Sequence, residues 1–241
     1  LTFPGTDYKI ASGTLTTQLR AEAGDSTADR IPITGDVAVR ADRGTFNIQQ
    51  LNLQTPATSL KATGQFSFEN DSNLQVDLNS SDANELQTVL VSSGLLPEVE
   101  AQMETYGIAL AGRLVFNGNI RGKLSSPDVN GSFSLASLLV NSNELGSLSA
   151  TVSMNGNEIR VTNGQLSEAD GGGVQFSLVK PRTGENNASL QATLDRANAG
   201  TLSALLASFP GGHGTSGISS LETQADVSGV IKVDGIPNAM N

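Results

Sequence analysis

The sequence predicts an all-β fold with short helical insertions, in which antiparallel strands are organised as repeated units. Three observations predict it: apolar residues alternate with polar ones over many short segments, turn-forming residues separate these segments, and the pattern recurs along the chain. The composition agrees, since hydrophobic residues make up 37% of the 241 positions, aromatic residues only 4%, and there are 26 glycines. Such a mix favours many short strands packed by aliphatic side chains over long helices.

The clearest alternation runs from Ile108 to Leu124, where every second residue is apolar or glycine and the positions between include Arg113, Asn117 and Lys123. A period of two places the apolar set on one face of a sheet and the polar set in water. The same pattern occurs over 60–68, 74–78, 129–135, 148–154 and 225–233. These segments are predicted to be half-buried antiparallel strands.

Turn-forming residues lie between the predicted strands. Asn155-Gly156 is the strongest hairpin signal, because Asn-Gly readily supplies the two positive φ angles of a type I′ turn. Residues 41–44 and 125–128 predict softer turns, and 170–173 predict a flexible loop or bulge. This last glycine run lacks the lysine and the strand–loop–helix setting of a phosphate-binding loop.

Helical spacing interrupts the alternation at a few places. Asp82 and Glu85 have capping-box spacing before a short apolar helix that ends near Gly94. Pro97 opens a second short helix ending at Gly107, in which Glu98 and Glu100 complement the helix dipole. A third apolar stripe covers 200–209. Helices this short are expected to pack on the sheet.

Self-comparison reveals an internal repeat with offsets of 110 to 116 residues. Residues 74–78 match 190–194, 65–67 match 175–177, and further matches are Leu86/Leu202, Gly118/Gly229, Ile120/Ile231 and Pro127/Pro237. The sequence is therefore interpreted as a fragment, 1–241, of a repeat-built β domain with approximate units 1–130 and 131–241. Like units are expected to stack along one axis, and the open ends of a cut array leave edge strands prone to association.

Charge and composition argue against several kinds of partner and chemistry. The formal net charge is −10 and the pI is about 4.5, which predicts no nucleic-acid partner, especially with so few aromatic residues. There is no cysteine, so thiolate catalysis, disulfides and cysteine metal sites are excluded. No apolar run is long enough for a transmembrane helix. The chain shows no signal peptide and is interpreted as a piece of a longer protein.

The sequence predicts no enzyme activity, no cofactor, no catalytic residues and no metal site. His213 is the only histidine, and it stands in a glycine loop without nearby partners for metal binding or acid–base chemistry. No nucleophile with an adjacent base is evident.

The order of motifs resembles a known family. The predicted Asp-Ala-Asn-Glu-Leu helix precedes Gly112-Arg-Leu-Val-Phe-Asn-Gly118-Asn-Ile-Arg-Gly122, then Pro127-Asp-Val-Asn-Gly131, and Leu145-Gly-Ser-Leu148 comes before the Asn155-Gly156 turn. From about Ser59 to the end, this order resembles the AsmA-like and TamB-like (translocation and assembly module) proteins. The resemblance implies an elongated antiparallel sheet, curled like a taco or half-pipe around a hydrophobic groove.

The resemblance also implies a function. The chain would be a periplasmic segment of an inner-membrane-anchored bridge, its anchor outside this sequence, implicated in phospholipid transport between the inner and outer membranes. Phospholipid acyl chains would be its partner, and an outer-membrane assembly protein a second one. The candidate groove residues are Phe66, Phe68, Leu110, Leu114, Phe116, Ile120, Phe133, Leu135, Val152, Met154, Phe176 and Val227.

Other interpretations stay open at the level of the sequence. The same alternating residues would also fill the dry core of a β-sandwich. The alternative functions are a scaffold that receives outer-membrane protein strands by edge pairing, and a purely structural envelope stalk.

Overall fold

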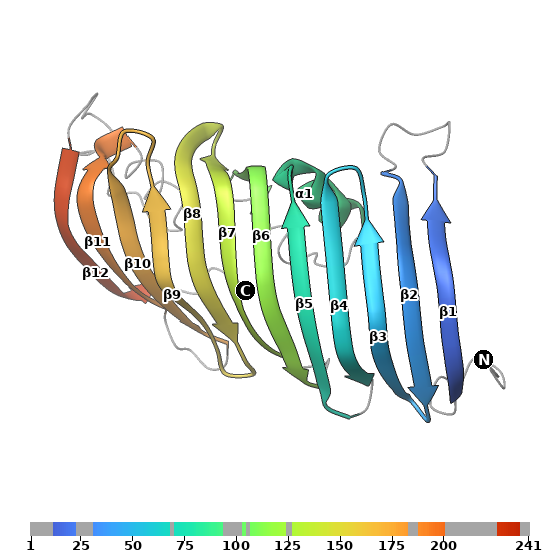
Figure 1. The fold of residues 1–241 in the computed structure, drawn as a ribbon. Helices are drawn as coiled ribbons and strands as arrows, with labels where there is room; N and C mark the ends of the chain where they lie inside the picture. Colours follow the sequence, from blue (N-terminus) through green and yellow to red (C-terminus); the bar gives the residue numbers. More distant parts are fainter. Residues whose placement is uncertain are drawn as a thin grey trace. The chain divides into compact units, whose positions relative to one another are not determined.

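The computed structural model describes residues 12–22, 31–67, 70–93, 103–104, 107–123, 127–182, 188–200 and 226–236. In these ranges the chain forms a sheet of twelve strands whose order follows the sequence (Figure 1), with one short α-helix. The strands are β1 (Ser12–Ala21), β2 (Ile33–Asp42), β3 (Thr45–Gln54), β4 (Thr58–Ser67), β5 (Ser72–Ser80), β6 (Ile108–Gly122), β7 (Asp128–Val140), β8 (Asn143–Met154), β9 (Glu158–Ser167), β10 (Gly173–Pro181), β11 (Ala188–Asn198) and β12 (Asp226–Ile236), and the helix is α1 (Ala83–Ser93). The predicted all-β antiparallel fold with short helical insertion is confirmed.

The chain divides into two compact units, which are described separately below. Unit 1 comprises Leu1–Ser81, Val115–Gly131 and Met154–Gly156, and unit 2 comprises Asp82–Leu114, Ser132–Ser153 and Asn157–Asn241. Strands β1 to β5 therefore lie in unit 1, and β9 to β12 lie in unit 2.

All six segments with clear alternation are strands. They correspond to β4, β5, β6, β7, β8 and β12. Strands β1, β2 and β3 were not predicted individually, although the sequence from 13 to 53 carries the same period-two pattern in a weaker, Thr-rich form.

The turns confirm one expectation and correct another. Arg43 and Gly44 connect β2 to β3 with φ angles of 45° and 81°. The Asn155-Gly156 segment does connect β8 to β9, but neither residue has positive φ, so the predicted type I′ turn is wrong. The connection spans Asn155–Asn157, one residue more than that turn type requires. A pair of residues with positive φ occurs instead at Asn141 and Ser142, between β7 and β8.

Helix α1 begins where the capping residue predicts. The backbone N–H of Asn84 donates to Oδ1 of Asp82 at 3.0 Å, which satisfies one of the free donors at the helix start. Of the helix predicted from Pro97 to Gly107, residues 103–104 are described as helical and Gly107 lies in a turn. Most of the apolar stripe over 200–209 lies outside the described residues.

The internal repeat is visible in the local structure. After β11, the N–H of Gly200 donates to Oδ1 of Asn198 at 2.8 Å, as Asn84 does to Asp82 after β5. The alanine that follows each capping residue is buried, with Ala83 0% and Ala199 2% exposed. The two positions differ by 116 residues, which matches the longer offset found in the sequence.

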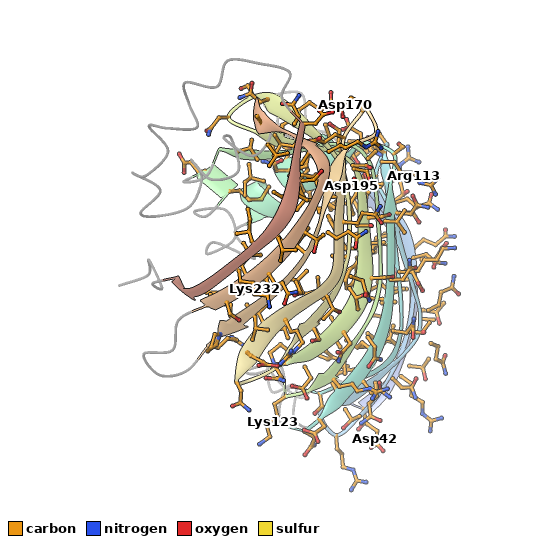
Figure 2. The ribbon with its side chains drawn as sticks, turned by 90° about the vertical axis from the view of Figure 1, so that its left-hand side faces the viewer. Asp42, Arg113, Lys123, Asp170, Asp195 and Lys232 are labelled. Carbon is orange, nitrogen blue, oxygen red and sulfur yellow. The ribbon has the colours of Figure 1, made fainter. Side chains whose placement is uncertain are left out.

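Unit 2 contains a compact apolar core. Its strands β10 to β12 bend along their length (Figure 2). The buried cluster consists of Val140, Leu145, Leu166, Val174, Ala192, Leu194 and Ala197. Leu166, Val174 and Leu194 stand opposite one another on β9, β10 and β11, and directly opposed residues of an antiparallel sheet share a face.

Candidate functional site

The register of unit 1 places apolar side chains on one sheet face. Directly opposed residues form rows across the strands, such as Val37–Leu51–Ala62–Val76, which crosses β2 to β5. We call this surface the apolar face. On β1 to β5 it comprises Leu15, Leu19, Val37, Val39, Phe46, Ile48, Leu51, Leu53, Leu60, Ala62, Phe66, Leu74, Val76 and Leu78.

The apolar face of unit 1 is only partly covered. Ala62 and Leu74 are buried, but most of the larger side chains, including Leu51 and Val37, are half-buried. On β1, Leu15 is 40% and Leu19 is 44% exposed. In unit 2 the equivalent face contains a buried cluster, in which Leu166 is 3% and Leu194 is 5% exposed, beside half-buried residues such as Phe176. We call the partly covered surface on β1 to β5 the open apolar face.

The opposite face of unit 1 is almost entirely polar. Its rows contain Thr, Ser, Asn, Gln and a few charged residues, as in Asp36–Asn52–Lys61–Asp77. Asn119 of β6 extends this face, because its Nδ2 donates to Oδ1 of Asn73 and to the carbonyl of Leu74, each at 3.0 Å. We call this surface the polar face.

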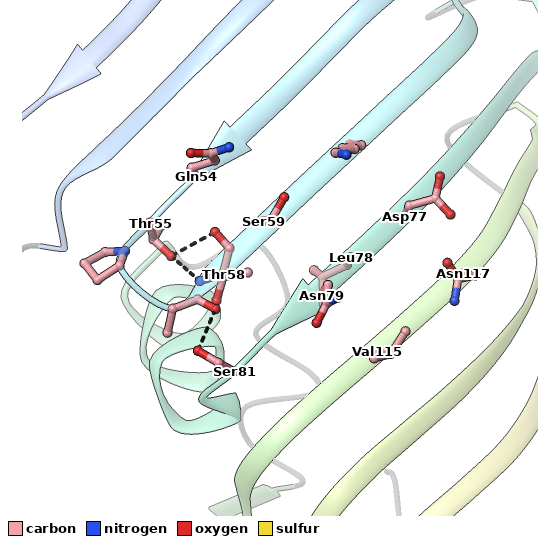
Figure 3. A pocket seen from close by; sticks show the side chains of 13 residues that line it. Gln54, Thr55, Thr58, Ser59, Asp77, Leu78, Asn79, Ser81, Val115 and Asn117 are labelled. Carbon is pink, nitrogen blue, oxygen red and sulfur yellow. Dashed lines mark hydrogen bonds between the residues drawn. The ribbon is translucent and has the colours of Figure 1, made fainter.

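A shallow hollow of about 480 Å³ lies on the polar face near the turn between β3 and β4 (Figure 3). Ser59, Asn79 and Asn117 project on the same side of the strands there. The turn beside it is held by Thr55, whose Oγ1 accepts from the N–H of Thr58 at 3.0 Å. The lining consists of hydroxyl and amide side chains, one lysine, one aspartate and the apolar residues Pro56, Ala57, Leu78 and Val115, so it offers hydrogen bonds without a strong charge.

Unit 2 has the same division into two faces. Gln165, Gln175 and Thr193 form a row on its polar face and line a second hollow of about 420 Å³. On its apolar face the ring of Phe176 lies over Gly164, where a Cβ would come within 2.7 Å of ring atoms. Only glycine leaves that space, so this ring position depends on the residue opposite it.

Three candidate groove residues of unit 1 lie on its apolar face. Phe66 is directly opposite Phe46, with ring centroids 6.0 Å apart. Phe116 and Ile120 alternate with Asn119, which is on the polar face, so they point to the apolar side. A Cβ on Gly131 would lie 2.6 Å from the Phe116 ring, which places the start of β7 beside it. Met154, also assigned to unit 1, is half-buried.

Of the seven candidates in unit 2, two are buried and five are half-buried. Leu114 is 4% and Leu135 is 2% exposed. Phe176 and Val227 are partly buried and pack against the buried cluster of unit 2. The remaining candidates, Leu110, Phe133 and Val152, are half-buried. Phe68 lies outside the described residues, as does His213.

The predicted residues thus belong to both units, with Phe66, Phe116, Ile120 and Met154 in unit 1 and the other described candidates in unit 2. Sequence reasoning missed the most exposed part of the apolar face, which is formed by Leu15 and Leu19 of β1, and their neighbours on β2. The sequence does alternate through Leu15, Leu19, Val37 and Val39. The alternation is weak because threonine and glycine occupy several positions on the same face.

The described residues contain no group of three or more His, Cys, Asp or Glu side chains that could hold a metal ion. The buried carboxylate oxygen Oε1 of Glu168 has no hydrogen-bond partner in the described part of the chain, while Oε2 accepts from the N–H of Asn198 at 2.8 Å. This carboxylate closes the β9–β10 turn against the end of β11, which is a structural role. Among the described residues, no helix has the length and apolarity to cross a membrane.

Comparison with known proteins identifies a family. Residues 2–129 match the family described as "Uncharacterized protein conserved in bacteria (DUF2125)". The chain belongs to this family. No curated protein matches, and no solved structure matches. The residues that match the family include strands β1 to β6, and β1 to β5 carry the open apolar face. The resemblance to AsmA-like and TamB-like proteins rests on the residue pattern alone.

Proposed function

We propose that this DUF2125 chain is a segment of a periplasm-spanning, bridge-like protein whose apolar sheet face shelters phospholipid acyl chains between the two membranes. The proposal also places the chain near the AsmA-like and TamB-like proteins. It is a binding function without catalysis, and it requires no cofactor.

The open apolar face of β1 to β5 is the observation that carries this proposal. Large aliphatic side chains such as Leu51 and Leu53 remain half-buried there, while the other side of the same strands is polar. Burying apolar surface against an acyl chain contributes about 0.8 kcal/mol for each CH₂ removed from water. A run of about eight methylenes would therefore contribute roughly 6 kcal/mol before the cost of ordering the chain is subtracted.

The chemistry of this face favours acyl chains over most other ligands. Its side chains are aliphatic with two phenylalanines, so they provide contact area without hydrogen bonds that select one head group. A surface on which apolar side chains lie side by side and stay partly exposed is the kind of surface that serves as an interaction site. The polar face on the other side of the strands would remain in solvent.

Photo-crosslinking in cells tests the proposal on adjacent residues of one strand. A photo-reactive amino acid is placed at Val37, on the apolar face, and in a matched control at Asp36, which is exposed on the polar face. Both are made in the full-length protein, and adducts are analysed for lipid. We expect phospholipid adducts at Val37 and none at Asp36.

Two results would contradict the proposal. Equal lipid labelling at both positions would mean that contact does not depend on the apolar face. Purely intramolecular products at Val37 would mean that another part of the protein covers this face, which would leave a structural stalk as the better account. A second pair, Phe116 and Asn117 of β6, repeats the comparison on a strand with the same alternation.

A further inference from the structure

Four asparagines of the chain are followed directly by glycine, namely Asn117, Asn130, Asn155 and Asn163. An asparagine in this setting can react with its own backbone, because the amide nitrogen of the next residue can attack Cγ of the asparagine side chain. Glycine favours this ring closure, since it has no side chain to shield its nitrogen and its backbone rotates freely. The four pairs have the same residue types, so any difference in their reactivity comes from the surrounding structure.

The backbone separates the four pairs, although all four asparagines are exposed. Three of the pairs lie inside strands, with Asn117 in β6, Asn130 in β7 and Asn163 in β9. The hydrogen bonds of a sheet hold the ψ angle of a strand residue at about +135°. This extended backbone keeps the next nitrogen away from the asparagine side chain.

The glycines of these three pairs are also packed in the sheet. Gly118 and Gly164 are buried, and Gly131 is half-buried. A Cβ on Gly118 would lie 2.9 Å from the carbonyl oxygen of Asn130, so the backbones of β6 and β7 are adjacent there. Gly164 stands directly opposite Phe176 of β10. Ring closure at these positions requires local opening of the sheet, which has a free-energy cost.

The pair Asn155-Gly156 lies outside the strands. It belongs to the connection between β8 and β9, and Asn155, Gly156 and Asn157 are all exposed. Backbone torsions in a surface connection can change without breaking the ladder of a strand. Among the four pairs, this one therefore needs the least structural change for the glycine nitrogen to reach the side chain.

We propose that Asn155 is a site of spontaneous deamidation in the folded protein. The amide nitrogen of Gly156 forms a bond to Cγ of Asn155 and gives up its proton, the bond between Cγ and Nδ2 breaks, and ammonia leaves. Water then opens the resulting cyclic imide at either of its two carbonyl groups. The products are aspartate and isoaspartate, and in isoaspartate the main chain continues through the former side chain. Water is the only co-reactant.

The modification changes the connection between β8 and β9 in charge and in length. Either product places a carboxylate where a neutral amide stood, on a chain whose net charge is already −10. Isoaspartate also adds a methylene group to the main chain of the connection. Hairpin register depends on the length of the loop, so the two products are not structurally equivalent.

Peptide mapping by mass spectrometry tests the assignment in the full-length protein. The folded protein is incubated at neutral pH, and tandem spectra measure the conversion of amide to acid at each pair. Asn155 should convert at least tenfold faster than the three strand asparagines, since a tenfold difference needs only about 1.4 kcal/mol of protection by the sheet. In urea, where the sheet is lost, the four rates should become similar. Equal rates in the folded protein, or a ranking that persists in urea, would overturn the proposal.

Two substitutions test the reaction itself. Gly156→Val places a branched side chain beside the attacking nitrogen and should slow the conversion of Asn155 at least tenfold. Gly156 does not have positive φ, so its backbone accepts a side chain. Asn157→Ser is the matched control, because it changes the same connection and keeps the 2.7 Å hydrogen bond from the N–H of Arg182 to the carbonyl of residue 157. It should leave the rate at Asn155 unchanged.

Undiminished conversion in Gly156→Val would exclude attack by the glycine nitrogen, and an equal loss in both variants would mean that the shape of the connection, and not this nitrogen, controls the rate. Neither measurement involves the apolar face. The outcome is therefore independent of lipid crosslinking at Val37, and the failure of either idea is distinguishable from that of the other.

Discussion

Buried hydroxyl groups hold one end of the β4–β5 pair. Thr58 and Ser80 oppose each other across the two strands, and their hydroxyl oxygens are 2.9 Å apart. Ser80 is fully buried and Thr58 is 9% exposed. A polar pair in such a position is stable only because each group has a hydrogen-bond partner.

Removal of one hydroxyl should therefore cost more than its small size suggests. We expect Ser80→Ala to lower the free energy of unfolding by about 1 to 3 kcal/mol, because a buried hydrogen bond is lost. Urea denaturation followed by circular dichroism measures this change. The double variant Thr58→Val with Ser80→Ala should be less destabilised than the sum of the single variants. Strict additivity would show that the two hydroxyls do not interact.

At the scale of elements, the sequence predicted regular structure better than it predicted turns. Alternation identified β4 to β8 and β12, because one face of each strand is apolar and the other polar. The Asn155-Gly156 turn was assigned the wrong geometry, since dipeptide preference does not determine loop length and the connection has three residues. The positive φ angles occur at Asn141 and Ser142, where Asn tolerates them but the pair is not a strong turn signal.

The start of α1 is an element whose stability depends on one side chain. Asp82→Ala removes the acceptor for the N–H of Asn84 and should destabilise the protein by about 1 kcal/mol. Asp82→Asn is the matched control, because Asn198 performs the same capping in the second repeat. In thermal unfolding, the unsubstituted protein and Asp82→Asn should have similar midpoint temperatures, and Asp82→Ala should have a lower one. If both variants lost the same stability, the charge of Asp82 and not its capping hydrogen bond would be the stabilising feature.

For the molecule as a whole, alternation predicted which residues share a face but not which parts of that face are covered. Leu51 and Leu166 each lie on an apolar face, yet Leu51 is half-buried and Leu166 is 3% exposed. Periodicity reports the direction of a side chain relative to its own strand. Coverage depends on contacts between residues distant in the sequence, which no local pattern contains. For that reason the sequence could name twelve candidate groove residues but not their exposure, since Leu114 and Leu135 are buried whereas Phe116 and Phe133 are half-buried.

This difference between the two units gives the last prediction. Leu166→Asn places an amide in a closed apolar cluster and should cost about 3 to 5 kcal/mol, since both packing and desolvation are unfavourable. Leu51→Asn makes the same chemical change on the open face, where water reaches the side chain, and should cost about 1 kcal/mol. Urea denaturation of both variants measures the two values. If Leu51→Asn also abolishes lipid labelling at Val37 while the protein stays folded, the exposed apolar residues of β1 to β5 serve binding and not stability. A cost for Leu51→Asn as large as that for Leu166→Asn would mean that this face is enclosed in solution, and the binding proposal would lose its structural basis.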